Sequence, residues 1–123
     1  TNDRGKLQEA VTVLHTLQKS EIPLPHGKFQ TSRYSLVRLI PQTGRMHQLR
    51  KHTSHIFHPI IGDRPHGCNK QNKLFLENFN LTQMMLHAKK LSFQHPSLEK
   101  RIVINADYSN EFKRIASALQ FKL

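Results

Sequence analysis

Cysteine, glycine and long apolar runs are scarce in this 123-residue sequence. Its single cysteine, Cys68, excludes an internal disulfide and a cysteine-based zinc site. With five glycines and no glycine-rich motif, a phosphate-cradling glycine loop is also excluded. No apolar run approaches the ~20 residues of a membrane-spanning helix, so we expect no membrane association. One cysteine fits a reducing compartment, and we expect a cytoplasmic protein.

Acidic residues are scarce as well. Eight Asp and Glu stand against 19 Lys and Arg, which gives a formal charge of +11 and a pI near 10.3. That excess of positive charge predicts a polyphosphate partner, and its even spread along the chain predicts a folded basic face rather than a tail. A structural RNA-binding protein would show the same balance. Charge therefore indicates nucleic acid without indicating an activity.

The hydrophobic pattern predicts an α+β unit with a mixed, mainly antiparallel sheet flanked by helices. Alternating apolar and β-branched residues predict five strands, at residues 8–17, 32–40, 84–87, 91–95 and 101–106. Residues 32–40 are apolar on both faces, which predicts a fairly central strand. His95-Pro96-Ser97 is expected to form a hairpin turn between the last two strands.

Helices are expected at residues 45–56, at 71–78 and after residue 109. In the last of these, Ser109 or Asn110 is the expected N-cap and Glu111 lies in the first turn, where it favours the helix dipole. The residues expected on its buried stripe are Phe112, Ile115, Ala116 and Leu119.

The helix at 45–56 follows Pro41, which ends a strand, and a Thr43-Gly44 turn in which Thr43 is the expected cap. Its expected buried stripe consists of Met46, Leu49, Thr53 and Ile56, and Pro59 ends the helix.

Arg50 lies at the edge of that stripe, so its guanidinium is expected near the core boundary. A charge there needs a carboxylate or another acceptor, because leaving it unpaired costs several kcal/mol. Arg45 and Lys51 lie close to a helix N-terminus, and the two cations together with exposed N–H groups favour phosphate binding.

Four histidines, His47, His52, His55 and His58, suggest a metal site at first sight. No acidic residue lies between Glu21 and Asp63, and Cys68 alone cannot complete a site. Because zinc sites use three or four convergent ligands, we predict no metal and assign these histidines to capping, hydrogen bonding or phosphate contact. A Ser-His-Asp hydrolase is not indicated, since no Gly-x-Ser-x-Gly elbow is present.

The run Thr43-Gly44-Arg45-Met46-His47-Gln48-Leu49-Arg50 resembles the Thr-Gly-Arg-x-His-Gln-(Leu/Ile)-Arg motif of the RluA family of pseudouridine synthases. Three further segments resemble the same family, in the same order along the chain. They are Glu9-Ala10-Val11-Thr12, His58-Pro59-Ile60-Ile61-Gly62-Asp63, and Met85-Leu86-His87-Ala88 followed by residues 91–96.

The resemblance implies that residues 1–123 are the C-terminal portion of a catalytic domain that uses no cofactor. Such an enzyme flips a uridine out of structured RNA, breaks its N-glycosidic bond, rotates the base and rejoins it through carbon. By resemblance, Arg50 pairs with the catalytic aspartate and Leu49 forms the pocket wall. The residues expected to contact RNA are Arg45, His47, Gln48 and Lys51.

The catalytic aspartate itself is not found in this sequence. In the family it belongs to a His-Arg-Leu-Asp motif, whereas Asp3, Asp63 and Asp107 lie in other contexts. Tyr34 and Tyr108 do not match the motif of the tyrosine that stacks on the base. We therefore expect both residues in the N-terminal half of the same enzyme, which is the expected protein partner, and we expect this chain alone to be an inactive monomer.

Finer similarities favour a tRNA substrate. Arg33-Tyr34, His66-Gly67 and Gln71-Asn72 are similar to family members that modify a uridine in the tRNA acceptor stem, while ribosomal RNA enzymes share the main motifs. The alternative is a non-catalytic basic RNA-binding module on the same scaffold. The presence or absence of the catalytic aspartate in the complete protein separates the two.

Overall fold

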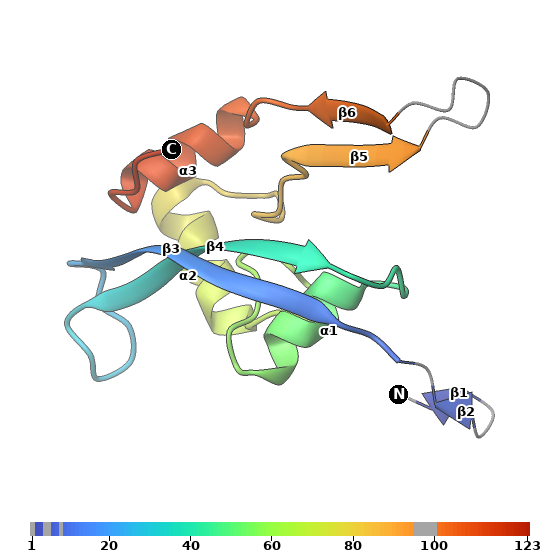
Figure 1. Cartoon of the computed structure of the whole chain (residues 1–123). Helices are drawn as coiled ribbons and strands as arrows, with labels where there is room; N and C mark the ends of the chain where they lie inside the picture. Colours follow the sequence, from blue (N-terminus) through green and yellow to red (C-terminus); the bar gives the residue numbers. More distant parts are fainter. Residues whose placement is uncertain (1, 4–5, 8, 95–100) are drawn as a thin grey trace.

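The structure, a computed structural model, describes residues 2–3, 6–7, 9–94 and 101–123. It confirms the α+β class, and each strand pair that it describes is antiparallel (Figure 1). Two short strands, β1 (Asn2–Asp3) and β2 (Lys6–Leu7), pair with each other at the start of the chain. The described strands form three separate two-stranded pairs.

The longest pair is the hairpin of β3 (Thr12–Ile22) and β4 (Ser32–Pro41). Its register runs from Thr12 opposite Pro41 to Ile22 opposite Ser32. The prediction for β4 holds within one residue, whereas β3 begins four residues later than expected and extends five residues further. Within the described part of the chain β4 pairs only with β3, so the expected central position of β4 is not found there.

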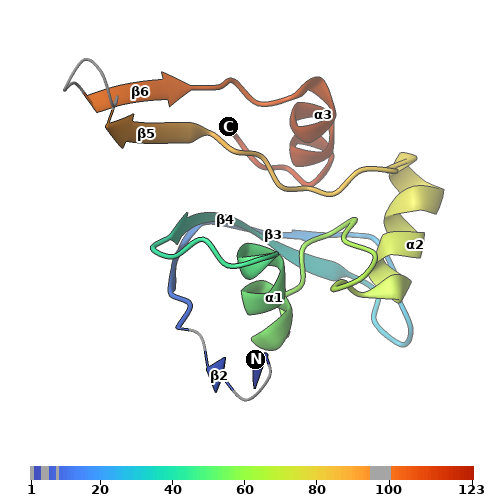
Figure 2. The ribbon, with the colours of Figure 1, turned by 90° about the vertical axis from the view of Figure 1, so that its right-hand side faces the viewer.

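Helix α1 (Gln48–His55) lies against one face of this hairpin. Helix α3 (Asn110–Ala118) and the strand pair of β5 (Lys90–Gln94) and β6 (Arg101–Asn105) lie on the other side (Figures 1 and 2). The helix begins three residues later than predicted, and Thr43 does not cap it. His47 occupies the N-cap position with φ of 51° and makes no side-chain cap.

The predicted buried stripe of α1 is wrong at both ends. Met46 is 76% exposed because it precedes the helix, and Ile56 is 50% exposed because it follows the helix. The buried residues of α1 are Gln48 and Thr53.

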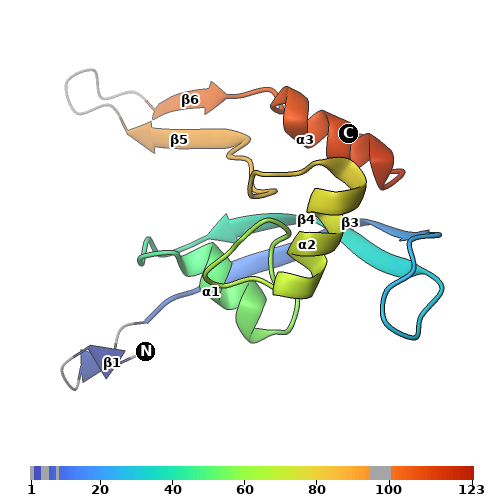
Figure 3. The ribbon, with the colours of Figure 1, turned by 180° about the vertical axis from the view of Figure 1, so that it is seen from behind.

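The core lies where α2 (Asn69–Phe79) and α3 (Asn110–Ala118) meet the closed end of the hairpin (Figure 3). Phe75 of α2 and Ile115 of α3 are fully buried, and the Tyr34 ring packs edge-on against Phe75 with centroids 5.1 Å apart. The other buried apolar residues are Ile22, Leu24, Leu81, Ala116, Leu119 and Phe121.

Both of these helices confirm the sequence analysis. Helix α2 begins two residues earlier than expected and ends one residue later. In α3 the Ser109 hydroxyl accepts a hydrogen bond from the Phe112 N–H at 3.1 Å, and Glu111 lies in the first turn. The predicted stripe is buried at Ile115, Ala116 and Leu119 and half-buried at Phe112.

The last strands are β5 (Lys90–Gln94) and β6 (Arg101–Asn105), an antiparallel pair as predicted. The turn expected at His95-Pro96-Ser97 lies outside the described residues. Residues 84–87, expected as a strand, are an irregular connection held to the loop before α2 by a 2.8 Å hydrogen bond from Met85 N–H to the Ile61 carbonyl. None of the described helices has the length and apolarity needed to cross a membrane.

Candidate functional site

The start of α1 is fixed to strand β3 by the buried side chain of Gln48. Its Nε2 donates to the Val11 carbonyl at 2.8 Å and to Thr12 Oγ1 at 2.9 Å. Its Oε1 accepts from Thr43 Oγ1 at 2.5 Å and from the Arg45 N–H at 3.1 Å. An amide has two donors and two acceptor positions, so all four are used. Gln48, expected to contact RNA, is instead placed to support the helix.

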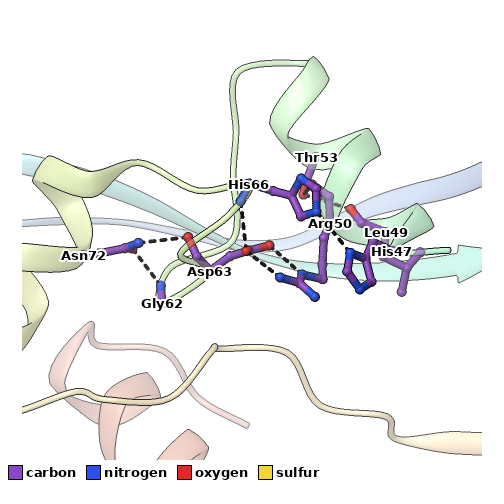
Figure 4. Close-up of polar contacts among 8 residues, drawn as sticks. All are labelled: His47, Leu49, Arg50, Thr53, Gly62, Asp63, His66 and Asn72. Carbon is purple, nitrogen blue, oxygen red and sulfur yellow. Dashed lines mark hydrogen bonds and ion pairs between the residues drawn. The ribbon is translucent and has the colours of Figure 1, made fainter. Parts of the chain in front are cut away.

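Arg50 projects from the first turns of α1 onto Asp63, in the loop before α2 (Figure 4). Nε of Arg50 donates to Oδ2 of Asp63 and Nη2 donates to Oδ1, both at 2.9 Å. The Asp63 side chain is 1% exposed and that of Arg50 is 19% exposed. This parallel two-bond geometry is the strongest form of an arginine–carboxylate contact. Arg50 was expected to need a carboxylate partner, and Asp63 of the same chain is that partner.

Both members of this pair are charged at neutral pH. The hydrogen bond from Arg50 lowers the pKa of Asp63 below its ordinary value, against the opposing effect of burial, and the backbone N–H of His66 adds to the lowering. The His66 N–H lies 3.2 Å from Oδ1 of Asp63. The hydrogen bond to Asp63 likewise raises the pKa of Arg50.

Sequence reasoning missed Asp63 as the partner of Arg50. The available signal was its isolation, because no acidic residue lies between Glu21 and Asp63 and the Asp63 carboxyl follows an apolar loop. A lone acid in apolar surroundings needs a cation once it is buried.

The loop that carries Asp63 is held rigidly. The side chain of Asn72 on α2 accepts from the Gly62 N–H at 2.8 Å and donates to the Asp63 carbonyl at 2.9 Å. Gly62 has φ of 88°, and a Cβ there would lie 2.1 Å from the Gln83 carbonyl oxygen. A Cβ on Gly67 would lie 1.9 Å from the Asp63 carbonyl oxygen. Glycine is therefore required at both ends of the loop.

A pair of histidines lies beside the ion pair. Nδ1 of His47 is 3.2 Å from Nε2 of His66, with the rings at 76° to each other. Partial loss of water contact lowers the pKa of His47, and the positive charge of Arg50 lowers it further. His47 was expected at the site. His66 entered the sequence analysis only through the similar segment His66-Gly67, and its contact with His47, 19 residues away, was not predicted.

The other expected site residues surround the start of α1. Leu49 is half-buried next to Arg50, and Lys51 is exposed. Arg45 is exposed and its Nε donates to the Glu9 carbonyl at 2.9 Å. The structure thus brings a fixed guanidinium, two histidines and two further cations to one end of α1. Within the described residues, no group of three or more His, Cys, Asp or Glu side chains could hold a metal ion.

Comparison with known proteins gives a consistent result. A model of the RNA pseudouridylate synthase family matches residues 1–55, which include the run from Thr43 to Arg50. The tRNA pseudouridine synthase C of Vibrio vulnificus is 44% identical over 108 residues, 88% of this chain and 44% of that protein. Its counterpart in Haemophilus ducreyi is 48% identical over 99 residues, 80% of this chain and 41% of that protein.

The chain spans less than half the length of these relatives, and a third, tRNA pseudouridine synthase C of Pectobacterium carotovorum, is 39% identical over 99% of the chain and 32% of its own length. The family match and these identities agree with the residues assembled around Arg50. On both grounds the chain belongs to the RNA pseudouridylate synthase family.

Proposed function

We propose that this chain is the C-terminal part of an enzyme that isomerises uridine to pseudouridine in structured RNA, with tRNA as the favoured substrate. The observation that carries the proposal is the orientation of Arg50. Asp63 engages Nε and Nη2 of the guanidinium, and Nη1 has no partner among the side chains and backbone that the structure describes. The relatives named as tRNA enzymes support the choice of substrate.

In this proposal Nη1 of Arg50 meets the catalytic aspartate supplied from outside residues 1–123. A guanidinium has five N–H donors, and the contact with Asp63 uses two of them. The remaining donors allow Arg50 to bind a second carboxylate and keep it ionised, because an adjacent positive charge lowers a carboxyl pKa. An ionised aspartate is the form that attacks or deprotonates the sugar. Leu49, half-buried beside Arg50, forms part of the wall of the uridine pocket.

Asp63 acts as a positioning residue in this scheme. Arginine side chains are flexible, and a functional guanidinium must be held in one orientation. The buried carboxylate of Asp63, itself fixed by the loop contacts of Asn72, holds the guanidinium through Nε and Nη2 and leaves Nη1 on the side away from that carboxylate.

RNA contact is assigned to Arg45, His47 and Lys51. Arg45 and His47 lie just before α1 and Lys51 lies in its first turn, and all three residues are exposed. Phosphate contacts from such residues position an RNA without reading its sequence. Gln48 is left out of this set because its four hydrogen-bonding positions are already used within the chain.

One observation favours the alternative, a non-catalytic RNA-binding module. Arg50 already has a carboxylate partner in Asp63, so its charge is balanced without a catalytic aspartate. The experiment that separates the two is to incubate the complete protein with a tRNA transcript and with a ribosomal RNA fragment, then count pseudouridines by mass spectrometry after derivatisation. The proposed enzyme converts a uridine in the tRNA. A module of the alternative kind binds both RNAs and converts no uridine.

A further inference from the structure

A pocket with a mixed apolar and polar lining lies between the Asp63 loop and α2. Its volume is about 290 Å³. Its apolar lining residues are Leu76 and Leu81, and its polar lining residues include Arg64, Asn69, Lys73 and Thr82. Leu76 is 46% exposed although it is a large apolar residue, so its surface is available to a ligand.

The charged side chains that line this pocket are both cations. Arg64 forms no salt bridge with any described residue. Lys73 has only a 3.8 Å contact with Glu77, and both of these side chains are more than half exposed. Solvent-exposed pairs of this kind contribute little, so Lys73 remains available to an anion.

The pocket and the candidate site share the loop that carries Asp63. Arg64 directly follows Asp63, and Asn72, which lines the pocket, makes both amide hydrogen bonds that fix that loop. Figure 4 shows Asn72 and the Arg50 side chain on opposite sides of the loop backbone. The same loop therefore supports both the candidate site and the pocket.

We propose that this pocket binds a phosphodiester of the RNA substrate, outside the uridine pocket. The inference rests on the proposed function. Arg64 supplies a planar fork that matches two phosphate oxygens, and Lys73 supplies a second positive charge. The apolar side chains of Leu76 and Leu81 lie against the sugar that is attached to this phosphate. A free inorganic phosphate has no such sugar.

The first test is the salt dependence of RNA binding by the complete protein. The dissociation constant for a tRNA transcript is measured over a series of salt concentrations for wild type, Arg64→Ala, Lys73→Ala and Lys70→Ala. Lys70 is the matched control, because it is an exposed lysine of the same helix that does not line the pocket. Loss of one phosphate contact reduces the slope of log K against log salt by about 1. Because Arg64 and Lys73 share one phosphodiester in this proposal, we expect the full reduction when both are replaced by Ala, a smaller reduction for each single variant, and an unchanged slope for Lys70→Ala.

The second test adds a negative charge without changing side-chain size. Asn69→Asp places a carboxylate at the pocket rim and in the first turn of α2, where a negative charge stabilises the helix. It is expected to weaken RNA binding while thermal stability stays equal or rises. Asn78→Asp, at an exposed position near the other end of the same helix and outside the pocket, is the control and leaves RNA binding unchanged.

In Asn69→Asp, RNA affinity is expected to fall while thermal stability does not. This combination distinguishes a binding defect from a folding defect. Unchanged salt slopes for both Arg64→Ala and Lys73→Ala, with a wild-type protein that forms pseudouridine, would overturn the pocket assignment alone. A wild-type protein that forms no pseudouridine would instead overturn the proposed function on which the inference rests. Inorganic phosphate that displaces the transcript at concentrations close to the dissociation constant of the RNA would show that the pocket binds a free anion. That result would also overturn the pocket assignment.

Discussion

Arg50 is held on one side and open on the other. Its Nε and Nη2 are fixed by Asp63, which is almost fully buried, and its Nη1 is directed away from that contact. Removing Arg50 therefore has two consequences. The Nη1 donor that does not contact Asp63 is lost, and the buried Asp63 carboxylate loses its partner. Experiments at this residue have to separate these consequences.

The first prediction concerns Arg50→Ala in the complete protein. Turnover is expected to fall below detection because the catalytic aspartate loses its cation, while the dissociation constant for tRNA changes little because Arg45, His47 and Lys51 remain. Single-turnover pseudouridine formation and filter binding measure the two quantities. Arg38→Ala, at an exposed position on β4, is the control for loss of a positive charge.

The double variant Arg50→Ala with Asp63→Asn isolates the catalytic loss from the folding loss. The uncharged amide that this second substitution introduces no longer requires a cation, so stability is expected to recover relative to Arg50→Ala while activity does not. Activity that survives in either variant would show that Arg50 has no role in the reaction.

The second prediction concerns acid stability. The folded-state pKa of Asp63 lies below its ordinary value of 3.8, chiefly because of the hydrogen bond from Arg50. The unfolded chain therefore binds this proton more readily, and the stabilisation is fully present above the ordinary value and is lost as the pH falls through the folded-state pKa. Urea midpoints of wild type and Asp63→Asn, measured from about pH 6 down to about pH 2, are expected to converge as the pH falls. A constant difference over that range would contradict the assignment.

Sequence reasoning found part of this site. The need of Arg50 for a carboxylate follows from its place at the edge of the helix, but Asp63 escapes identification because it lies 13 residues away on a loop of unknown path. Gln48 is assigned to RNA by its place between His47 and Arg50, and its burial cannot be foreseen without the position of strand β3. Polar side chains satisfied by backbone groups of a distant segment leave no periodic signal.

Helix α1 is bounded by residues in the left-handed region. His47 precedes it with φ of 51°, and Phe57 follows it with φ of 64°. A left-handed conformation costs a residue with a Cβ about 1–2 kcal/mol. His47 contacts His66 in that conformation, whereas the Phe57 side chain is 90% exposed. Phe57 therefore has strain without a burial that offsets it.

The third prediction is that Phe57→Gly stabilises the protein. Glycine is the favoured residue just after a helix end because it reaches positive φ without a clash, and the expected gain is about 1 kcal/mol after the added flexibility of the unfolded chain is counted. Urea denaturation measures it. Phe57→Ala is the control, since it removes the exposed ring but keeps the Cβ. Equal stabilisation by both variants would attribute the effect to the ring rather than to the backbone.

The fourth prediction compares two glycines that sequence alone would rank the other way. Gly44 belongs to the motif, yet a Cβ at Gly44 meets no atom within 4 Å, whereas a Cβ at Gly67 meets the backbone of Asp63. Gly67→Ala is expected to destabilise by about 1–3 kcal/mol and to displace the Asp63 loop, and Gly44→Ala is expected to be tolerated. Thermal unfolding tests both. A greater loss for Gly44→Ala would show that the motif glycine is required for folding.

A helix or strand is easier to predict from the sequence when the residues that determine it lie within it or next to it. Helix α3 is predictable with its cap because Ser109, Glu111 and the apolar stripe all lie within the helix or next to it. The start of α1 is predicted too early because Gln48 and Thr43 contact strand β3 and the residue before it, not the helix end. Residues 84–87 look like a strand in composition, but in the structure they form an irregular connection with a backbone hydrogen bond from Met85 to Ile61.

At the scale of the whole molecule, the chain combines a high positive charge with a small core. The charge of +11 and the cations at the start of α1 and at the α2 pocket fit a protein that lies against RNA. Several large apolar side chains of the hairpin and of the α1 ends are exposed in residues 9–89, among them Leu14, Ile40 and Met46. These exposures fit a chain that represents less than half the length of its relatives.

Sequence alone indicated the family and predicted a nucleic-acid partner, because a motif and a charge balance can be recognised without a three-dimensional structure. It could not predict that the β3–β4 hairpin pairs with no other strand among the described residues, or that a pocket lies beside α2, because both depend on which segments pack together. We propose from the motif comparison that the catalytic aspartate lies outside residues 1–123.

The measurement that tests the central claim most directly is pseudouridine formation on a tRNA transcript by the complete protein and, in parallel, by residues 1–123 alone. The account predicts conversion by the complete protein and none by the isolated chain, because Arg50 then lacks the aspartate that it is positioned to hold. Conversion by the isolated chain would contradict the account, since it would place the catalytic carboxylate within these 123 residues.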